Sequence, residues 1–143
     1  TRMIELTRHD ESSVRLMAVY QLGSIGDPQA RNVLVAALRD PDVLVTWNAA
    51  FALARKGDIA GREVLAGLLD KAYVDRAMQA MIQKGEPVPV PENLQKYRVA
   101  AVVWLAKLDA QGAAPVLKKM STEETDLAVR NAAIQQLNEL KRK

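Results

Sequence analysis

The chain has 143 residues, with 20 lysines and arginines against 17 acidic residues, one histidine and no cysteine. A chain of this length buries a hydrophobic core without disulfides or structural metals. The absence of cysteine excludes thiol catalysis, disulfides and thiolate zinc sites, and the single histidine excludes the His-rich sites of zinc and non-haem iron enzymes. We therefore expect one domain without cofactors.

The formal charge of +3 depends on the C-terminal tail. Removing Lys141, Arg142 and Lys143 leaves 17 basic against 17 acidic residues, so the basic excess is local. The longest apolar runs are much shorter than the ~18 residues that a membrane span requires, and no cleavable signal peptide is visible. A cytoplasmic location is the default expectation.

The first expected element is a lone helix over residues 1–8, with Met3, Ile4 and Leu6 as its apolar residues. No polar capping unit precedes the first repeat, although terminal repeats need a polar outer face. We therefore expect either that more protein precedes Thr1, so that this is the C-terminal part of a longer chain, or that a partner covers this end.

A repeat follows, with first helices that share one pattern. The copies are VRLMAVYQLGSIGD (14–27), VTWNAAFALARKGD (45–58), YRVAAVVWLAKLDA (97–110) and VRNAAIQQLNEL (129–140). An alanine and a leucine four residues later recur in every copy: Ala18 and Leu22, Ala49 and Leu53, Ala101 and Leu105, Ala133 and Leu137. The small residue lets two helices approach closely, and the leucine one turn later fills the same seam.

A second helix follows the first in each complete copy. Asp27 and Asp58 supply N-caps, and Gly26 and Gly57 suit the left-handed position that ends a helix. The second helices carry apolar residues at helical spacing: Val33, Leu34, Ala37 and Leu38; Val64, Leu65, Leu68 and Leu69; Val116, Leu117 and Met120. Each unit is thus a helix hairpin with one apolar side, which must stack on a neighbour.

These residues resemble HEAT repeats, specifically the short bacterial kind also found in phycobilin lyases. The motif is carried by Glu11, Val14-Arg15, Ala18, Leu22-Gly23 and Gly26-Asp27, and again by Asp126, Val129-Arg130, Ala133 and Leu137. The resemblance implies an all-α fold, a right-handed α-solenoid of stacked helix pairs with about eight or nine helices. It also implies an arginine ladder that ties repeats together, and the i,i+4 spacing of Glu11 with Arg15 and of Asp126 with Arg130 suits helical ion pairs.

The middle of the chain departs from the pattern. Thr46 stands where the arginine is expected, and Asp109-Ala110 replaces Gly-Asp, which predicts a different turn. Roughly twenty extra residues predict a helix over 71–84 and then an extended segment with alternating prolines. We expect one domain over 1–143, with repeats near 10–39, 41–70 and 93–121, an irregular part over 71–91 with a Pro-rich loop at 85–91, and a capping helix over 123–141.

Apolar residues on a second side of the first helices predict packing on two sides. We expect Tyr20, Trp47 and Phe51 in the core, and Tyr97 as well because it takes the valine position of the motif. In the last copy this side becomes polar, at Asn131, Gln135 and Asn138, as a terminal repeat requires.

No residue pattern points to catalysis. His9 lies in a turn without partners for general-base or metal chemistry, so we predict an exposed loop histidine. The chain shows no nucleophile–base pair, no Gly-rich phosphate loop and no metal cluster, and we predict no enzymatic activity.

The candidate partner-binding residues lie mainly on the second helices, which line the concave face in HEAT-type solenoids. The resemblance therefore implies that the side chains of these residues project into a groove: Arg31, Asn32, Arg62, Glu63, Lys118 and Lys119. Arg39 and Lys71 would lie at the edge of the groove. The alternative is that they form an ordinary charged, solvated helix face. Trp104 is either an exposed aromatic anchor or is covered by the Pro87–Pro91 loop, and we favour the covered position.

We predict a non-catalytic scaffold that binds a partner protein or peptide. If the lysines and arginines of the groove contact the partner, an acidic partner is favoured. A nucleic-acid-binding module is one alternative, because the same groove suits a phosphate backbone. A bilin lyase or lyase subunit is another, on the repeat type alone. The identity of the partner and the oligomeric state do not follow from the sequence.

Overall fold

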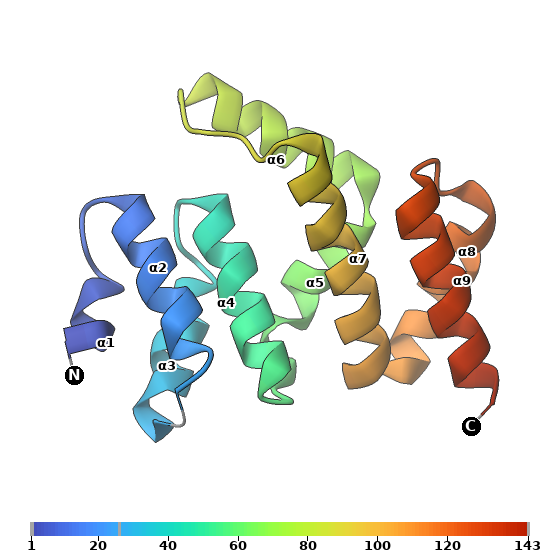
Figure 1. Ribbon diagram of the computed structural model, residues 1–143, viewed down its shortest axis with the longest axis horizontal. Helices are drawn as coiled ribbons and strands as arrows, with labels where there is room; N and C mark the ends of the chain where they lie inside the picture. The colour runs from blue at the N-terminus through green and yellow to red at the C-terminus, as the bar shows by residue number, and fades with distance from the viewer. Residues whose placement is uncertain (1, 26, 143) are drawn as a thin grey trace. The chain divides into compact units, whose positions relative to one another are not determined.

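The computed structural model describes residues 2–25 and 27–142, and these residues form nine α-helices, one short 3-10 helix and no strand (Figure 1). The chain folds into two compact units, unit 1 over residues 1–64 and unit 2 over residues 65–143. The all-α fold made of helix hairpins confirms the prediction from the repeat.

Unit 1 contains five helical elements, and a sixth begins at its end: α1 (Arg2–Leu6), α2 (Ser12–Leu22), α3 (Pro28–Ala37), α4 (Val43–Arg55), η1 (Ile59–Gly61) and then α5 (Arg62–Leu69). The first helix, α1, packs on α2, while α4 packs on α2, α3 and η1 (Figure 1). The predicted lone N-terminal helix is confirmed for residues 2–6, and Thr1 lies outside the described residues.

Aspartate side chains cap three of the helical elements of unit 1, α3, α4 and η1. The Asp27, Asp42 and Asp58 side chains each accept a hydrogen bond from the amide two residues later, at 2.9 Å in every case. Gly57 has φ 74°, the left-handed conformation that glycine adopts without strain, so its predicted role is confirmed. Gly26 lies outside the described residues.

The core of unit 1 follows the seam between α2 and α4. Both motif alanines and both motif leucines are buried there: Ala18, Leu22, Ala49 and Leu53. The two helices approach closely, since a Cβ added to Gly23 at the end of α2 would lie only 2.9 Å from Ala52 Cβ on α4. Small residues are therefore required at these contacts, as the repeat predicts.

Aromatic residues on the second side of the first helices differ in burial. Trp47 is fully buried and Phe51 is buried, so these two predictions are confirmed. The prediction for Tyr20 is wrong: its side chain is 63% exposed, and the Arg55 guanidinium carbon lies 5.8 Å from its ring centroid. An apolar side of a helix is buried only where a neighbouring element covers it, and α1 leaves the Tyr20 ring uncovered.

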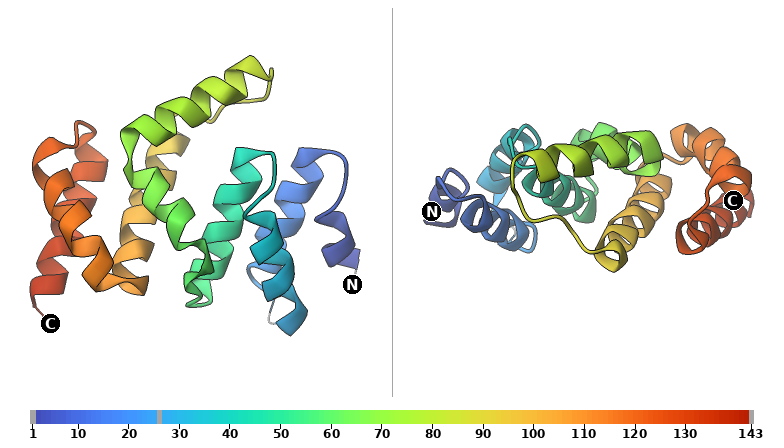
Figure 2. Two further views of the ribbon diagram at one scale, coloured as in Figure 1. Left: turned by 180° about the vertical axis from the view of Figure 1, so that it is seen from behind. Right: turned by 90° about the horizontal axis from the view of Figure 1, so that it is seen from above.

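Unit 2 contains the end of α5 and four further helices: α6 (Lys71–Gln83), α7 (Pro91–Leu108), α8 (Ala110–Glu123) and α9 (Leu127–Lys141). Both α8 and α9 pack on α7 and on each other, as the left view of Figure 2 shows. A non-helical segment over 84–90 joins α6 to α7, and Pro91 is the first residue of α7 and not the last of the loop. Proline is favoured at a first helical position because it lacks the amide proton that would have no partner there.

The turn between α7 and α8 differs from the Gly-Asp turns, as predicted. Asp109 alone separates the two helices, with φ −146° and ψ 71°, and its side chain caps α8 by accepting from the Gly112 amide at 3.1 Å.

The last helix has the predicted capping character. Asn131, Gln135 and Asn138 are exposed, while Val129 and Ala133 are buried.

Tyr97 on α7 is half-buried, so it contributes to the edge of the core rather than to its centre. None of the described helices is long and apolar enough to cross a membrane.

Candidate functional site

The predicted partner-binding residues fall in both units. Arg31 and Asn32 lie on α3, and Arg62 and Glu63 begin α5, all in unit 1. In unit 2, Lys118 and Lys119 lie on α8 and Trp104 on α7. Each set belongs to a surface of its own unit.

On unit 1, Arg31 is held in an ion pair. Its Nε donates to Asp58 Oδ2 at 2.6 Å, which ties α3 to the cap of η1. Partial burial raises the pKa of Asp58, but the Ala60 amide and the Arg31 guanidinium together bring it below its usual value. Arg31 thus links α3 to the start of η1, although its side chain is 58% exposed.

The other unit 1 candidates lie at or near the surface. Arg62 is half-buried and lies 3.4 Å from the carboxylate of its neighbour Glu63, which is 91% exposed. Asn32 is exposed. An exposed ion pair between sequence neighbours contributes little binding or folding energy.

On unit 2, a groove of about 420 Å³ lies between the end of α5, the start of α6 and α8. We call it the α5–α8 groove. Its apolar lining comes from Ala66 and Leu69 on one side and from Val116 and Met120 on the other. Val116 is 39% exposed, so an apolar surface is open to solvent at this point.

Charged side chains complete the lining of the α5–α8 groove: Asp70, Lys71, Lys119, Glu123 and Glu124. The two lysines form i,i+4 pairs on exposed helix surface, Lys71 with Asp75 at 3.0 Å and Lys119 with Glu123 at 3.8 Å. Exposed pairs of this kind are weak, so both ammonium groups remain able to contact a partner. Lys118 is also exposed but does not line the groove.

Among the charged residues of the lining, Glu124 is buried, and Arg98 holds it in place. The Arg98 Nη2 donates to Glu124 Oε1 at 2.6 Å, and Glu124 Oε2 accepts from the Asp126 amide at 3.0 Å. Burial raises the pKa of the Glu124 carboxyl, but these hydrogen bonds and the charge of Arg98 outweigh it and bring the pKa below its usual value. The carboxylate is therefore ionised and fully engaged at neutral pH.

Trp104 lies away from the Pro-rich segment. It follows Pro91, the first residue of α7, by thirteen positions, which places it about 20 Å farther along the helix axis. The predicted cover by the Pro87–Pro91 loop is therefore wrong. The ring is half-buried, and Lys107 Nζ lies 5.0 Å from its centroid, within the range of a cation–π contact.

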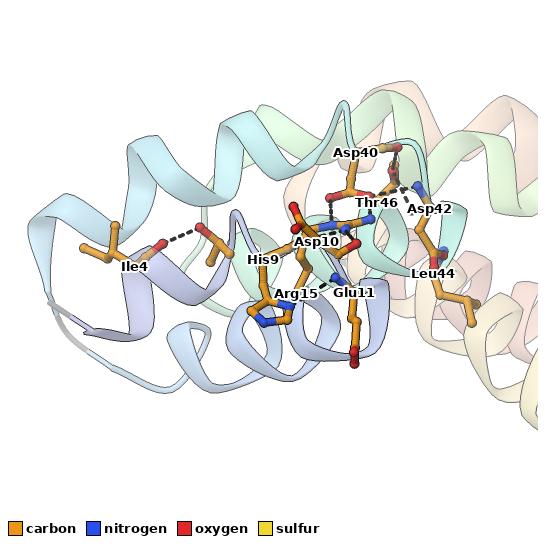
Figure 3. Close-up of polar contacts among 10 residues, drawn as sticks. Ile4, His9, Asp10, Glu11, Arg15, Asp40, Asp42, Leu44 and Thr46 are labelled. Atoms are coloured by element: carbon orange, nitrogen blue, oxygen red, sulfur yellow. Dashed lines mark hydrogen bonds and ion pairs between the residues drawn. The ribbon is translucent and has the colours of Figure 1, made fainter.

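The motif arginines bind residues of other elements and not the acids four positions earlier. Arg15 donates from Nε to Asp40 Oδ2 at 2.9 Å and from Nη2 to Asp40 Oδ1 at 3.1 Å (Figure 3). Arg130 donates from Nε to the Ser121 carbonyl at 2.9 Å. The predicted pairs with Glu11 and Asp126 are thus corrected: the arginines reach across to a neighbouring turn or helix, which fits the ladder that the resemblance implies.

The turns that lead into α2, α4 and α9 share one hydrogen bond. A side chain two residues before the N-cap accepts a hydrogen bond from the N-cap amide. His9 accepts from Glu11 at 3.1 Å and Asp40 from Asp42 at 2.8 Å (Figure 3). Glu124 accepts from Asp126 at 3.0 Å in the same way. His9 is exposed, as predicted, and its Nδ1 has this structural role. Among residues 2–25 and 27–142, no group of three or more potential ligands could hold a metal ion.

The sequence did not identify the Arg98–Glu124 pair or the α5–α8 groove. Arg98 was visible as a motif arginine, but its partner is 26 positions away and no local spacing pointed to it. Val116 was assigned to the apolar seam of α8, whereas it lines the open groove.

Comparisons with known proteins agree with this architecture. The family model for HEAT repeats matches residues 1–83, more than half of the chain. No curated protein matches the chain. The repeated alanine–leucine seam, the hairpin stacking and the family match lead to one conclusion: the chain belongs to the HEAT repeat family.

Proposed function

We propose that the chain is a non-catalytic interaction module that binds a partner protein through the α5–α8 groove. The observation that carries the proposal is an open apolar lining, with Val116 at its exposed edge and lysines beside it. An apolar side chain of the partner would enter the groove, where it loses contact with water on several sides. Such buried anchors dominate the binding energy of protein interfaces.

The family supports this reading at a general level. HEAT repeats are generally protein-interaction scaffolds and are generally non-enzymatic. The size of the groove, about 420 Å³, falls in the range of pockets that bind compact groups.

The charges around the groove favour a partner that places a carboxylate near its apolar anchor. The ammonium groups of Lys71 and Lys119 are held by exposed pairs, with Asp75 and Glu123. A carboxylate of the partner would compete with these acids for the lysines. Asp70 and Glu123 also line the groove, so the proposal is one acidic residue beside the anchor and not a strongly acidic segment.

We place the partner contact on α8 and not on α3. The ion pair of Arg31 with Asp58 supports a structural role for that arginine. Asn32, Arg62 and Glu63 do not line the α5–α8 groove. Lys119 is therefore the predicted site residue to which the proposal gives the main role, with Lys118 next to it.

A charge placed in the groove tests the proposal. Val116→Asp puts a carboxylate at the partly exposed apolar edge, and Leu127→Asp is the matched control, because Leu127 is 70% exposed on α9 outside the groove. We expect Val116→Asp to bind the partner captured by the parent chain at least about ten-fold more weakly, equivalent to about 1.4 kcal/mol, and Leu127→Asp to bind it unchanged.

Equal binding by Val116→Asp and the parent would contradict the proposal. Retention of the parent on DNA at low salt, lost steeply as salt rises, would instead favour the nucleic-acid alternative.

A further inference from the structure

Arg98 bonds to both walls of the α5–α8 groove. Its Nε donates to the Leu68 carbonyl at 2.9 Å, and its Nη2 donates both to the Leu69 carbonyl at 3.3 Å and to Glu124 Oε1 at 2.6 Å. Leu69 and Glu124 themselves line the groove, one at the end of α5 and the other directly after α8. One buried guanidinium therefore spans the two walls.

The other motif arginines do not make this link. Arg15 contacts one side chain in the following turn and carbonyls of its own turn, and Arg130 contacts a carbonyl of α8. The difference lies at α5, where Leu68 stands two residues before the N-cap Asp70, the position that Asp40 takes before Asp42. Leucine offers no side-chain acceptor, so the α5 end presents only its backbone carbonyls, and Arg98 binds them.

Packing alone does not fix the spacing of the two walls. The main contacts of α8 are with α7 and α9, and α5 is not among its main packing partners. Arg98 is 5% exposed, so its hydrogen bonds are shielded from water and hold their geometry better than surface contacts would. A planar guanidinium with several donors suits this task, whereas an ammonium lacks the fixed fork.

We propose that Arg98 is a positioning residue that sets the distance between the α5 wall and the α8 wall of the groove and so adapts it to the partner's apolar anchor. The consequence for binding rests on the proposed function, but the consequence for the spacing does not. The two can therefore fail separately.

Spin labels across the groove measure the spacing without a partner. The chain has no cysteine, so Ala72→Cys and Lys118→Cys give one label on each side, both at exposed positions outside the lining. In this background we expect Arg98→Met to shift and broaden the distance distribution measured by pulsed electron paramagnetic resonance. Arg130→Met is the matched control, because it removes another motif arginine of unit 2 that does not bond to α5. It should leave the distribution unchanged even where it lowers the melting temperature.

Two results decide the proposal. A folded Arg98→Met variant with the distance distribution of the parent would overturn it. Arg98→Met could lose its helical circular dichroism, because Glu124 is left buried without a partner. In that case Arg98→Lys decides, since it keeps a positive charge near Glu124 but cannot reproduce the fork of the guanidinium. An unchanged distance distribution in Arg98→Lys would equally overturn the proposal. If Val116→Asp binds the partner as well as the parent does, while Arg98→Met alters the distance between the spin labels, the proposed function alone is contradicted.

Discussion

Arg15 of α2 and Asp40 of the turn before α4 form a two-point ion pair, with Nε–Oδ2 at 2.9 Å and Nη2–Oδ1 at 3.1 Å. Both side chains are largely buried, and the hydrogen bond to Asp40 is the main cause that raises the pKa of Arg15 above its usual value. The same Asp40 accepts from the Asp42 amide, and Thr46 donates to the Asp40 carbonyl at 3.1 Å. The pair therefore joins one hairpin to the entry of the next.

Removing this arginine should destabilise unit 1. We expect Arg15→Met to lower the free energy of unfolding by about 2 kcal/mol, because a charge-assisted pair is lost and the Asp40 carboxylate is left without its partner. Urea unfolding followed by circular dichroism measures the change. Arg31→Met is the control: its pair with Asp58 is more exposed, and the loss should stay below about 1 kcal/mol. Equal losses in the two variants would show that the burial of the Arg15 pair has no energetic consequence.

The Arg98–Glu124 pair predicts a loss of stability in acid. The pKa of Glu124 in the folded chain is lower than its usual value of 4.5, so its contribution is fully present above that pH and disappears as the pH falls through the lower folded value. We expect Glu124→Gln to be less stable than the parent at pH 7. As the pH falls below 4.5, the free energy of unfolding should decrease less in Glu124→Gln than in the parent. Denaturant unfolding across this range measures both quantities. Asp75→Asn, which removes an exposed carboxylate of the same unit, should keep the acid dependence of the parent.

The burial of the aromatic residues predicts unequal costs of truncation. Phe51→Ala removes a buried ring and should cost about 3–5 kcal/mol, whereas Tyr20→Ala removes an exposed ring and should cost less than about 1 kcal/mol. Thermal or urea unfolding of the two variants gives the comparison. A large loss for Tyr20→Ala would mean that an element covers this face in solution.

The sequence predicted the helical seam because its signal is local. Ala18 with Leu22 and Ala49 with Leu53 recur at a helical spacing, and close contact requires small residues at those positions, so a periodic pattern is enough. Tyr20 was placed wrongly because a helical wheel shows which residues share a side but not whether a neighbour covers that side. Its aligned residue Phe51 is covered, and the two positions cannot be distinguished by composition.

The candidate site was less predictable because it depends on contacts distant in sequence. Arg98 binds carbonyls about thirty positions earlier and a carboxylate 26 positions later, while the sequence offered only i,i+4 partners. The groove lies between the end of α5, the start of α6 and α8, and in the sequence Val116 cannot be distinguished from the other apolar residues of α8.

The most direct test of the proposed function is amide hydrogen exchange of the chain with and without its captured partner. The account predicts that binding slows exchange in residues 66–71 and 116–124, which form the walls of the α5–α8 groove. Protection confined to other elements, such as α9 or the α3 surface, with these two segments unchanged, would contradict it.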